Sequence, residues 1–154
     1  MQYTKETLSG KMTMSEISED LQSLWVSCII GKLDPNVLKT MKPKLALKDA
    51  WGSSAAVRAA VWGRINVLTQ LVSSGVKLVD DVDLYGNTLL HHAASHAQTE
   101  TCVYLLEQGL KPDALNSLGE TPLAISTNLP STRYSRAETV LALSTSPKSR
   151  KAKT

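Results

Sequence analysis

Two segments of the chain carry apolar residues at the intervals of an amphipathic helix. These residues are Ile65, Leu68, Leu71 and Val72 in the first segment, and Cys102, Val103, Leu105 and Leu106 in the second. Gly75 and Gly109 follow the two segments, and glycine readily adopts the left-handed conformation that ends many helices. The pattern therefore predicts two equivalent helices, each ended by a glycine.

A shorter helix is expected ahead of each of these segments. Ser54, Thr88 and Thr121 each follow a glycine-containing turn, and a serine or threonine hydroxyl at such a position can cap the first turn of a helix. Ala59-Ala60 and Ala93-Ala94 lie in the middle of the first two of these helices, where small side chains allow neighbouring helices to approach closely.

These helices belong to an internal repeat. At an offset of 33 residues, Gly86, Thr88 and Leu90 align with Gly119, Thr121 and Leu123, and at an offset of 34 the segment 49–54 aligns with 83–88. One extra residue must then lie between Gly75 and Asp83. A single helix pair cannot bury its apolar face, so we expect the units to stack and to form the core together.

The repeated unit resembles an ankyrin repeat. Residues 83–116 read DLYGNTLLHHAASHAQTETCVYLLEQGLKPDALN, which is similar to the family pattern DxxGxTPLHxAAxxGxxxxVxxLLxxGAxxN. Residues 49–126 carry the resemblance, in two full repeats and the front half of a third. It implies an all-α solenoid of stacked helix-turn-helix units with short β-hairpin-like loops.

The flanks depart from the pattern and are expected to cap the stack. Thr13 to Glu16 is a candidate capping box, before an apolar stripe that ends near Gly31. The stripe consists of Ile17, Leu21, Leu24 and Cys28. Asp34 and Pro35 should open a second short helix that runs to about Met41. A helix over 137–143 is expected to close the other end, after a lengthened loop.

The predicted organisation is one repeat domain between two tails. The domain spans 14–143 and divides into 14–48, 49–82, 83–115 and 116–143, with the first and last units acting as caps. Residues 1–13 form an N-terminal tail, and 144–154 form a polar, basic C-terminal tail.

Composition and charge indicate the cellular compartment in which the protein is expected. Four cations fall in the last seven residues, and without them the chain has 13 basic and 14 acidic residues, so its body is nearly neutral. The sequence has no apolar stretch long enough for a membrane span, and its N-terminus lacks the apolar core of a signal peptide. We expect a reducing compartment, the cytoplasm or, in a eukaryote, the nucleus. Cys28 and Cys102 are interpreted as buried side chains, with a disulfide as the alternative.

The histidine-rich stretch 86–97 raises the question of a metal or catalytic site. His92 and His96 are four residues apart and could lie on one helical face, but no third ligand lies nearby in sequence, so we expect no metal. The resemblance gives His91 a bracing role between turns, with His92 and His96 exposed or contacting a partner. Catalytic motifs are absent, which predicts a non-enzymatic protein without cofactors. Glu100, Glu107, Glu120 and Asp113 are read as solvated surface.

The resemblance also implies a concave binding face. The positions that vary for binding in the family are the two after the leading Asp or Asn, the one after the glycine, and the two after the Ala-Ala pair. In this sequence they are Ala50, Trp51, Ser53, Val61 and Trp62, then Leu84, Tyr85, Asn87, Ser95 and His96, then Ser117, Leu118, Glu120, Asn128 and Leu129.

Aromatic residues at these positions suggest a function. Trp51, Trp62 and Tyr85 lie where core packing does not require large side chains, and Trp and Tyr dominate many binding hot spots. Trp25, with Ile29 and Ile30, could extend the stripe. The alternative is structural: Trp51 could cover a neighbouring turn, and Trp62 could fill space between helices. The candidate partner-binding residues are Trp51, Trp62, Leu84, Tyr85, Asn87, His96, Leu118 and Glu120.

Two functional hypotheses follow. The first is a protein-binding adaptor or inhibitor, monomeric when free, that captures one protein partner through its concave face. The second is a component of a nucleic-acid-associated complex whose tail contacts phosphate while the repeats dock on a protein. The tail cations are Lys148, Arg150, Lys151 and Lys153. Four such contacts would release only about three to four counterions, so the tail alone would bind weakly and without sequence preference.

Overall fold

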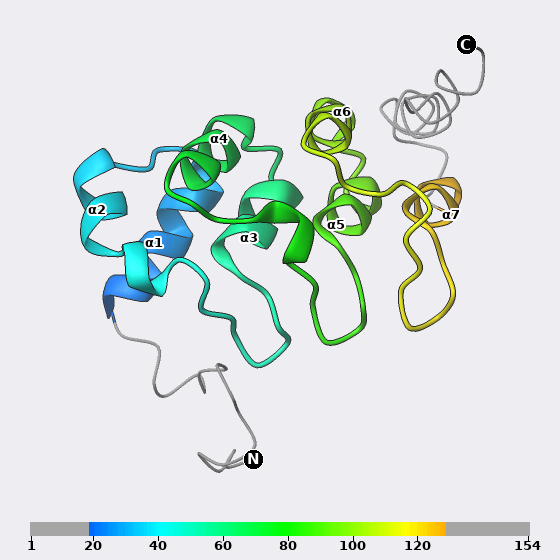
Figure 1. Cartoon of the computed structure of the whole chain (residues 1–154), viewed down its shortest axis with the longest axis horizontal. Helices are drawn as coiled ribbons and strands as arrows, with labels where there is room; N and C mark the ends of the chain where they lie inside the picture. Colours follow the sequence, from blue (N-terminus) through cyan, green and yellow to red (C-terminus); the bar gives the residue numbers. More distant parts are fainter. Residues whose placement is uncertain (1–18, 129–154) are drawn as a thin grey trace.

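Seven α-helices follow one another along residues 19–128, the part of the chain described by the computed structural model (Figure 1). They are α1 (Glu19–Ile30), α2 (Pro35–Thr40), α3 (Ala55–Val61), α4 (Ile65–Ser73), α5 (Leu89–Ser95), α6 (Thr99–Glu107) and α7 (Pro122–Thr127). Two short 3-10 turns, η2 (Lys42–Lys44) and η3 (Leu78–Asp80), lie in the connections. An isolated antiparallel bridge joins Val82 and Thr88 at the base of one loop.

α3 and α7 begin, and α4 and α6 end, where the sequence predicts. The Ser54 hydroxyl accepts a hydrogen bond from the Val57 amide, and the Thr121 hydroxyl accepts one from Ala124, at 3.3 and 3.1 Å. Both groups satisfy an amide that the first helical turn leaves without a partner. Gly75 and Gly109 follow α4 and α6 with φ of +96° and +91°, which confirms the left-handed ends.

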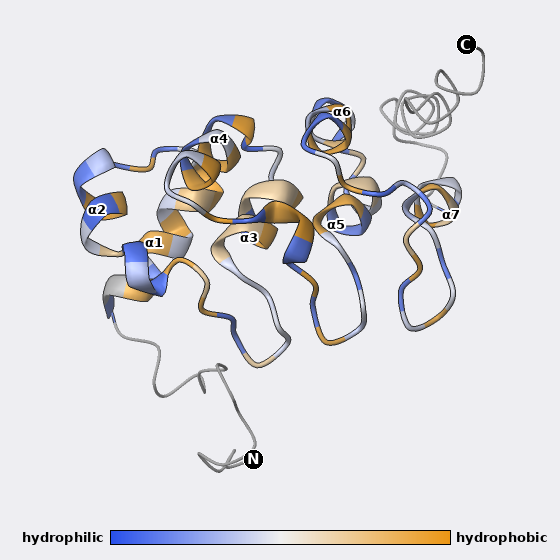
Figure 2. Cartoon of the chain, in the orientation of Figure 1, coloured by the Kyte–Doolittle hydropathy of each residue, from blue (hydrophilic) through white to orange (hydrophobic). Residues whose placement is uncertain are grey.

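The first helices of successive units form one layer. α1 packs on α3, α3 on α5 and α5 on α7, while α4 and α6 pack behind the first helix of their own unit (Figures 1 and 2). Ala59, Ala60, Ala93 and Ala94 are fully buried, and their small size permits this close stacking. The core includes Val67, Leu68, Leu71, Leu89, Leu90, Cys102 and Leu105. The all-α solenoid predicted from the sequence is confirmed.

The N-terminal unit is a true part of the stack. Leu21, Leu24 and Cys28 are fully buried on the inner face of α1. Two side chains of the next unit hydrogen-bond to carbonyl groups near the end of α1: Arg64 Nε donates to Ile29 and Asn66 Nδ2 to Gly31, both at 2.7 Å. The candidate capping box at 13–16, Ile17, the helix at 137–143 and both tails lie outside the described residues.

Trp25 corrects one sequence prediction. Its side chain is 6% exposed, so it does not extend an exposed aromatic stripe. The Arg58 guanidinium lies over the indole ring, 4.0 Å from the ring centroid. Trp25 follows Leu24 and lies one helical turn after Leu21, so it lies at the edge of the buried stripe. A cation from the next unit completes its cover.

Both cysteines are buried side chains, as predicted. Burial raises the pKa of the Cys28 thiol to about 11 and that of Cys102 to about 12. Both groups therefore remain protonated near neutral pH, and a protonated, buried thiol is a poor nucleophile.

Candidate functional site

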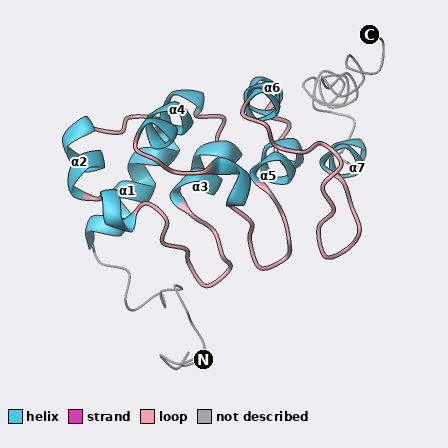
Figure 3. Ribbon diagram, viewed as in Figure 1, coloured by secondary structure: helices cyan, strands magenta, loops and turns pink. Residues whose placement is uncertain are grey.

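Three loops extend from the same side of the helix layer and are called fingers here (Figure 3). They comprise residues 49–53, 83–87 and 116–120, ahead of α3, α5 and α7. In each finger, one side-chain oxygen of the leading residue accepts hydrogen bonds from two backbone amides, those of the residues two and four positions later in the chain. The bonds are 2.9 and 2.9 Å for Asp49, 2.9 and 2.8 Å for Asp83, and 3.0 and 2.9 Å for Asn116.

The fingers are joined side by side through their backbones. The Leu84 amide donates to the Trp51 carbonyl at 3.1 Å, and the Ser117 amide donates to the Tyr85 carbonyl at 2.8 Å. Gly52 makes the first junction possible, because its φ is +81° and a Cβ there would lie 2.8 Å from the Leu84 nitrogen. The spacing of the three fingertips is therefore fixed by hydrogen bonds.

The fingertips present an apolar ridge to solvent, formed by Trp51, Leu84, Tyr85 and Leu118. The exposed fractions of these side chains are 54%, 52%, 59% and 81% respectively. Trp62, at the C-terminal end of α3, is 53% exposed, and His96 is exposed at the equivalent position after α5. Asn87 and Glu120 are half-buried at the finger bases.

A groove of about 550 Å³ runs between the second finger, the third finger and α7; it is called the third-finger groove below. Its lining residues are Tyr85, Asn87, Asn116, Ser117, Leu118, Glu120, Ile125 and Asn128. It unites four of the candidate partner-binding residues: Tyr85, Asn87, Leu118 and Glu120. Trp51, Trp62, Leu84 and His96 are not among its lining residues. Asn116 and Ile125 were not among the sequence candidates.

The leading carboxylates of the first two fingers meet the helix that follows. Asp49 Oδ2 lies 2.9 Å from the Arg58 guanidinium, and Asp83 Oδ2 lies 3.0 Å from His92 Nε2. Both pairs join a finger to the residue nine positions later. In the third unit these positions hold Asn116 and Ile125. The expectation that His92 is solvent-exposed is thus wrong, because its side chain is largely buried against Asp83. Its contact with a partner stays a prediction.

Burial also affects the charge of His92. It lowers the pKa of this imidazole, and the nearby Asp83 carboxylate offsets only part of that effect. The ring is therefore mostly neutral at pH 7, so it does not neutralise Asp83 as fully as Arg58 neutralises Asp49. The leading residue of the finger is thus paired with a cation in the first finger and with a mostly neutral imidazole in the second, and it is itself neutral in the third.

His91 braces the stack, as the sequence predicts. Its Nδ1 accepts a hydrogen bond from the Thr88 amide at 3.1 Å, and its Nε2 lies 3.0 Å from the Glu120 carbonyl oxygen. Because Nδ1 is an acceptor, the proton belongs on Nε2, which donates to Glu120. Desolvation by burial lowers the pKa of His91, which keeps the ring neutral. Val57 and Ala124 stand at the equivalent positions and provide no such bond.

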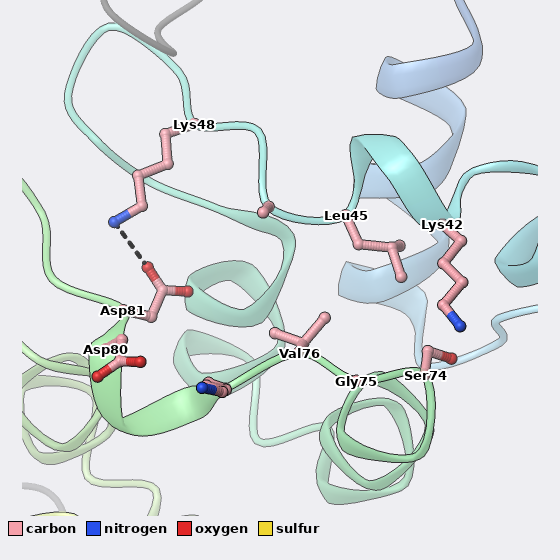
Figure 4. A pocket seen from close by; sticks show the side chains of 10 residues that line it. Lys42, Leu45, Lys48, Ser74, Gly75, Val76, Asp80 and Asp81 are labelled. Carbon is pink, nitrogen blue, oxygen red and sulfur yellow. Dashed lines mark ion pairs between the residues drawn. The ribbon is translucent and has the colours of Figure 1, made fainter.

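A second pocket, of about 400 Å³, lies between the turn at η2 and the segment after α4 (Figure 4). Lys48 Nζ lies 3.1 Å from Asp81 Oδ1, and the Ser54 hydroxyl donates to the other oxygen of the same carboxylate. Lys42 and Ser74 lie at the opposite end (Figure 4). Since Asp81 is satisfied within the chain, this network serves to hold the N-terminal unit to the loop before the second finger.

Residues 19–128 hold no group of three or more histidine, cysteine, aspartate or glutamate side chains that is arranged to bind a metal ion. Among the helices of this range, none has the length and apolar character needed to cross a membrane.

Comparison with known proteins agrees with this architecture. The family model described as ankyrin repeats (3 copies) matches residues 24–116 and 58–144. An ankyrin and IPT/TIG repeat-containing protein of Schizosaccharomyces pombe is 34% identical over 97 residues, which is 61% of this chain and 8% of that protein. A transient receptor potential cation channel subfamily A member 1 homolog of Caenorhabditis elegans is 35% identical over 72 residues, or 47% of this chain and 6% of that protein.

The chain spans less than a tenth of the length of either relative. The shared part is therefore the repeat array. The stacked helix pairs, the linked fingers and the family match lead to one conclusion: the chain belongs to the ankyrin-repeat family.

Proposed function

We propose that this chain captures one protein partner on the face formed by its fingers and first helices, and acts as an adaptor or an inhibitor. Ankyrin repeats are in general non-catalytic modules for protein-protein interaction. The observation that carries the proposal is the ridge of Trp51, Leu84, Tyr85 and Leu118, whose side chains are more than half exposed. Exposed apolar residues gathered on one surface mark interaction sites more often than isolated ones do.

The ridge suits a binding role for a second reason. Its side chains are mounted on fingers that the Asp49, Asp83 and Asn116 side chains hold in one conformation, so little conformational entropy remains to be lost on association. Three linked fingers and the groove beside them form one continuous surface. A standard interface covers about 800 Å² per partner, and we expect a face of three fingers to hold a single partner.

Affinity capture with the full chain tests the proposal. The bound proteins are identified by mass spectrometry from wild type, from the Trp51→Ala/Tyr85→Ala double variant and from Val103→Ala. Val103 is an exposed apolar residue on α6, behind the first helices, and serves as the matched control. We expect one protein to be retained by wild type and Val103→Ala and lost from the double variant. Equal retention by all three would reject the binding face.

A further inference from the structure

We propose that the third-finger groove receives an arginine or lysine side chain of the protein partner, carried next to an apolar residue that contacts Leu118. This inference rests on the proposed function and specifies the chemistry of its partner. It comes from a comparison of the three units that carry fingers, which follow the N-terminal unit and are numbered first to third, at the leading residue of the finger and the position nine residues later.

The first unit shows how the chain surrounds a cation. The Arg58 guanidinium lies 2.9 Å from Asp49 Oδ2 and 4.0 Å from the centroid of the Trp25 ring. A carboxylate and an aromatic face together bind a guanidinium group well, because the ring quadrupole and the charge both attract it. This arrangement fills the position nine residues after the start of the finger.

The third-finger groove brings together the same types of groups, and none of its lining residues is a cation. Ile125 stands where Arg58 stands in the first unit, and the carboxylate is supplied by Glu120 instead of the leading residue. The space beside Ile125 is the third-finger groove, and Tyr85 supplies an aromatic ring to its lining. The groove therefore combines a carboxylate, an aromatic ring and aliphatic side chains, and residues 116–128, the described part of the unit, contain no lysine or arginine.

The Glu120 carboxylate is positioned to form an ion pair with a basic side chain of the partner. Its Oε2 accepts one hydrogen bond from Asn116 Nδ2 at 3.1 Å, which orients the carboxylate but does not neutralise it. Within residues 19–128, Glu120 forms no ion pair, and the groove lining includes no lysine or arginine. A basic side chain would pair with Glu120, and its aliphatic part would lie against Ile125 and Leu118.

Apolar contact is expected beside the charge. Leu118 is 81% exposed, more than any other apolar residue on the ridge, and lies at the rim of the groove. A residue next to the basic one in the partner would cover it and gain from apolar burial. The predicted recognition element is thus a cation beside an aliphatic or aromatic residue.

The test uses the full chain and an immobilised library of acetylated, amidated hexapeptides. We expect wild type to select peptides with arginine or lysine next to an apolar residue. A selected arginine peptide should bind at least tenfold more weakly when its arginine is replaced by citrulline, which has nearly the same shape but no charge. Glu120→Gln should bind the arginine and citrulline peptides equally, and Glu107→Gln, an exposed acid on α6, should behave as wild type within twofold.

Three results would overturn the inference: no peptide retained by wild type, selection without preference for a cation, or equal binding of arginine and citrulline peptides to wild type. The chain's own basic tail is a competing occupant. A full-length variant with Lys148, Arg150, Lys151 and Lys153 changed to glutamine should bind the selected peptide within twofold of wild type. A gain of tenfold would assign the groove to the tail and overturn the proposed partner chemistry.

These outcomes are separate from failure of the proposed function. If Trp51→Ala/Tyr85→Ala retains the captured protein as wild type does, the binding face itself is wrong. If capture depends on that face but peptide selection ignores charge, the groove assignment alone is wrong.

Discussion

The imidazole of His91 connects two repeats, because its Nε2 lies 3.0 Å from the carbonyl oxygen of Glu120 while its Nδ1 accepts the Thr88 amide within its own unit. The side chain is 1% exposed. One ring thus satisfies a helix N-terminus and a finger base at the same time. Since the finger base carries Glu120, the same contact also fixes the backbone of the third-finger groove.

Removal of this ring should destabilise the protein. We expect His91→Ala to lower the free energy of unfolding by about 2–3 kcal/mol, because it leaves a buried cavity and two backbone groups without their partner. Urea denaturation followed by circular dichroism measures the change. His96→Ala, an exposed position at the opposite, C-terminal end of α5, should remain within about 0.5 kcal/mol of wild type. A similar loss in both variants would remove the special role of His91.

Acidification should weaken the fold. The pKa values of His91 and His92 are both lowered from the ordinary value of 6.5 by burial, so the unfolded chain binds protons more readily than the folded one. Their contribution is complete above pH 6.5 and declines as the pH falls from there toward the folded-state values. Unfolding free energies at pH 7.5, 6.5 and 5.5 should decrease in that order.

The histidine origin of this trend can be checked directly. A His91→Gln/His92→Gln double variant should be less stable at pH 7.5 and should lose much of the decline between pH 7.5 and 5.5. A wild-type stability that is constant or rises on acidification would contradict the assignment, as would an unchanged slope in the double variant.

Local signals in the sequence were sufficient for the helix pairs. Ser54 and Thr121 cap their helices and Gly75 ends α4 because these properties depend on a few neighbouring residues. His91 could be assigned because the resemblance to the family gives the histidine at this position a bracing role between turns. The structure supplied the bond to Glu120.

Contacts between units were harder to foresee. Trp25 was read as exposed because the cation that covers it, Arg58, is 33 residues away in the sequence. His92 was read as exposed although Asp83 precedes it by nine residues, the separation that also joins Asp49 to Arg58. A comparison of these two pairs in the aligned repeats would have revealed the contact. The groove could not be read from the sequence, since its walls come from two fingers and a helix.

Ala97 offers a prediction about backbone strain. Its φ is +53°, in the region that disfavours side chains, and it occupies the position where the preceding unit has Gly63 with φ of +67°. Ala97→Gly should raise the free energy of unfolding by about 0.5–1 kcal/mol, since relief of the left-handed strain exceeds the added chain entropy of glycine.

The reverse change supplies the control. Gly63→Ala should lower stability, because the conformation is left-handed and the added Cβ would lie 2.5 Å from Gln98 Oε1. Thermal unfolding of the two variants should therefore shift in opposite directions. Ala97 is 5% exposed. If Ala97→Gly were less stable than wild type, the packing of the Ala97 methyl group would stabilise the fold by more than the left-handed backbone conformation destabilises it.

The aromatic residues of the proposed binding face should differ from the core residue Trp25 in what they contribute to stability and to binding. Trp51, Trp62 and Tyr85 are each more than half exposed, so alanine at any of them should leave the unfolding free energy within about 0.5 kcal/mol of wild type. If they form the hot spot, each change should weaken partner binding by roughly 2 kcal/mol, measured by calorimetry with the captured protein.

Trp25→Ala should show the opposite behaviour, with a loss of about 3 kcal/mol or more in stability, because that indole is buried beneath Arg58. Large stability losses at the three exposed positions, with unchanged affinity, would show that these residues stabilise the fold and do not contribute to partner binding.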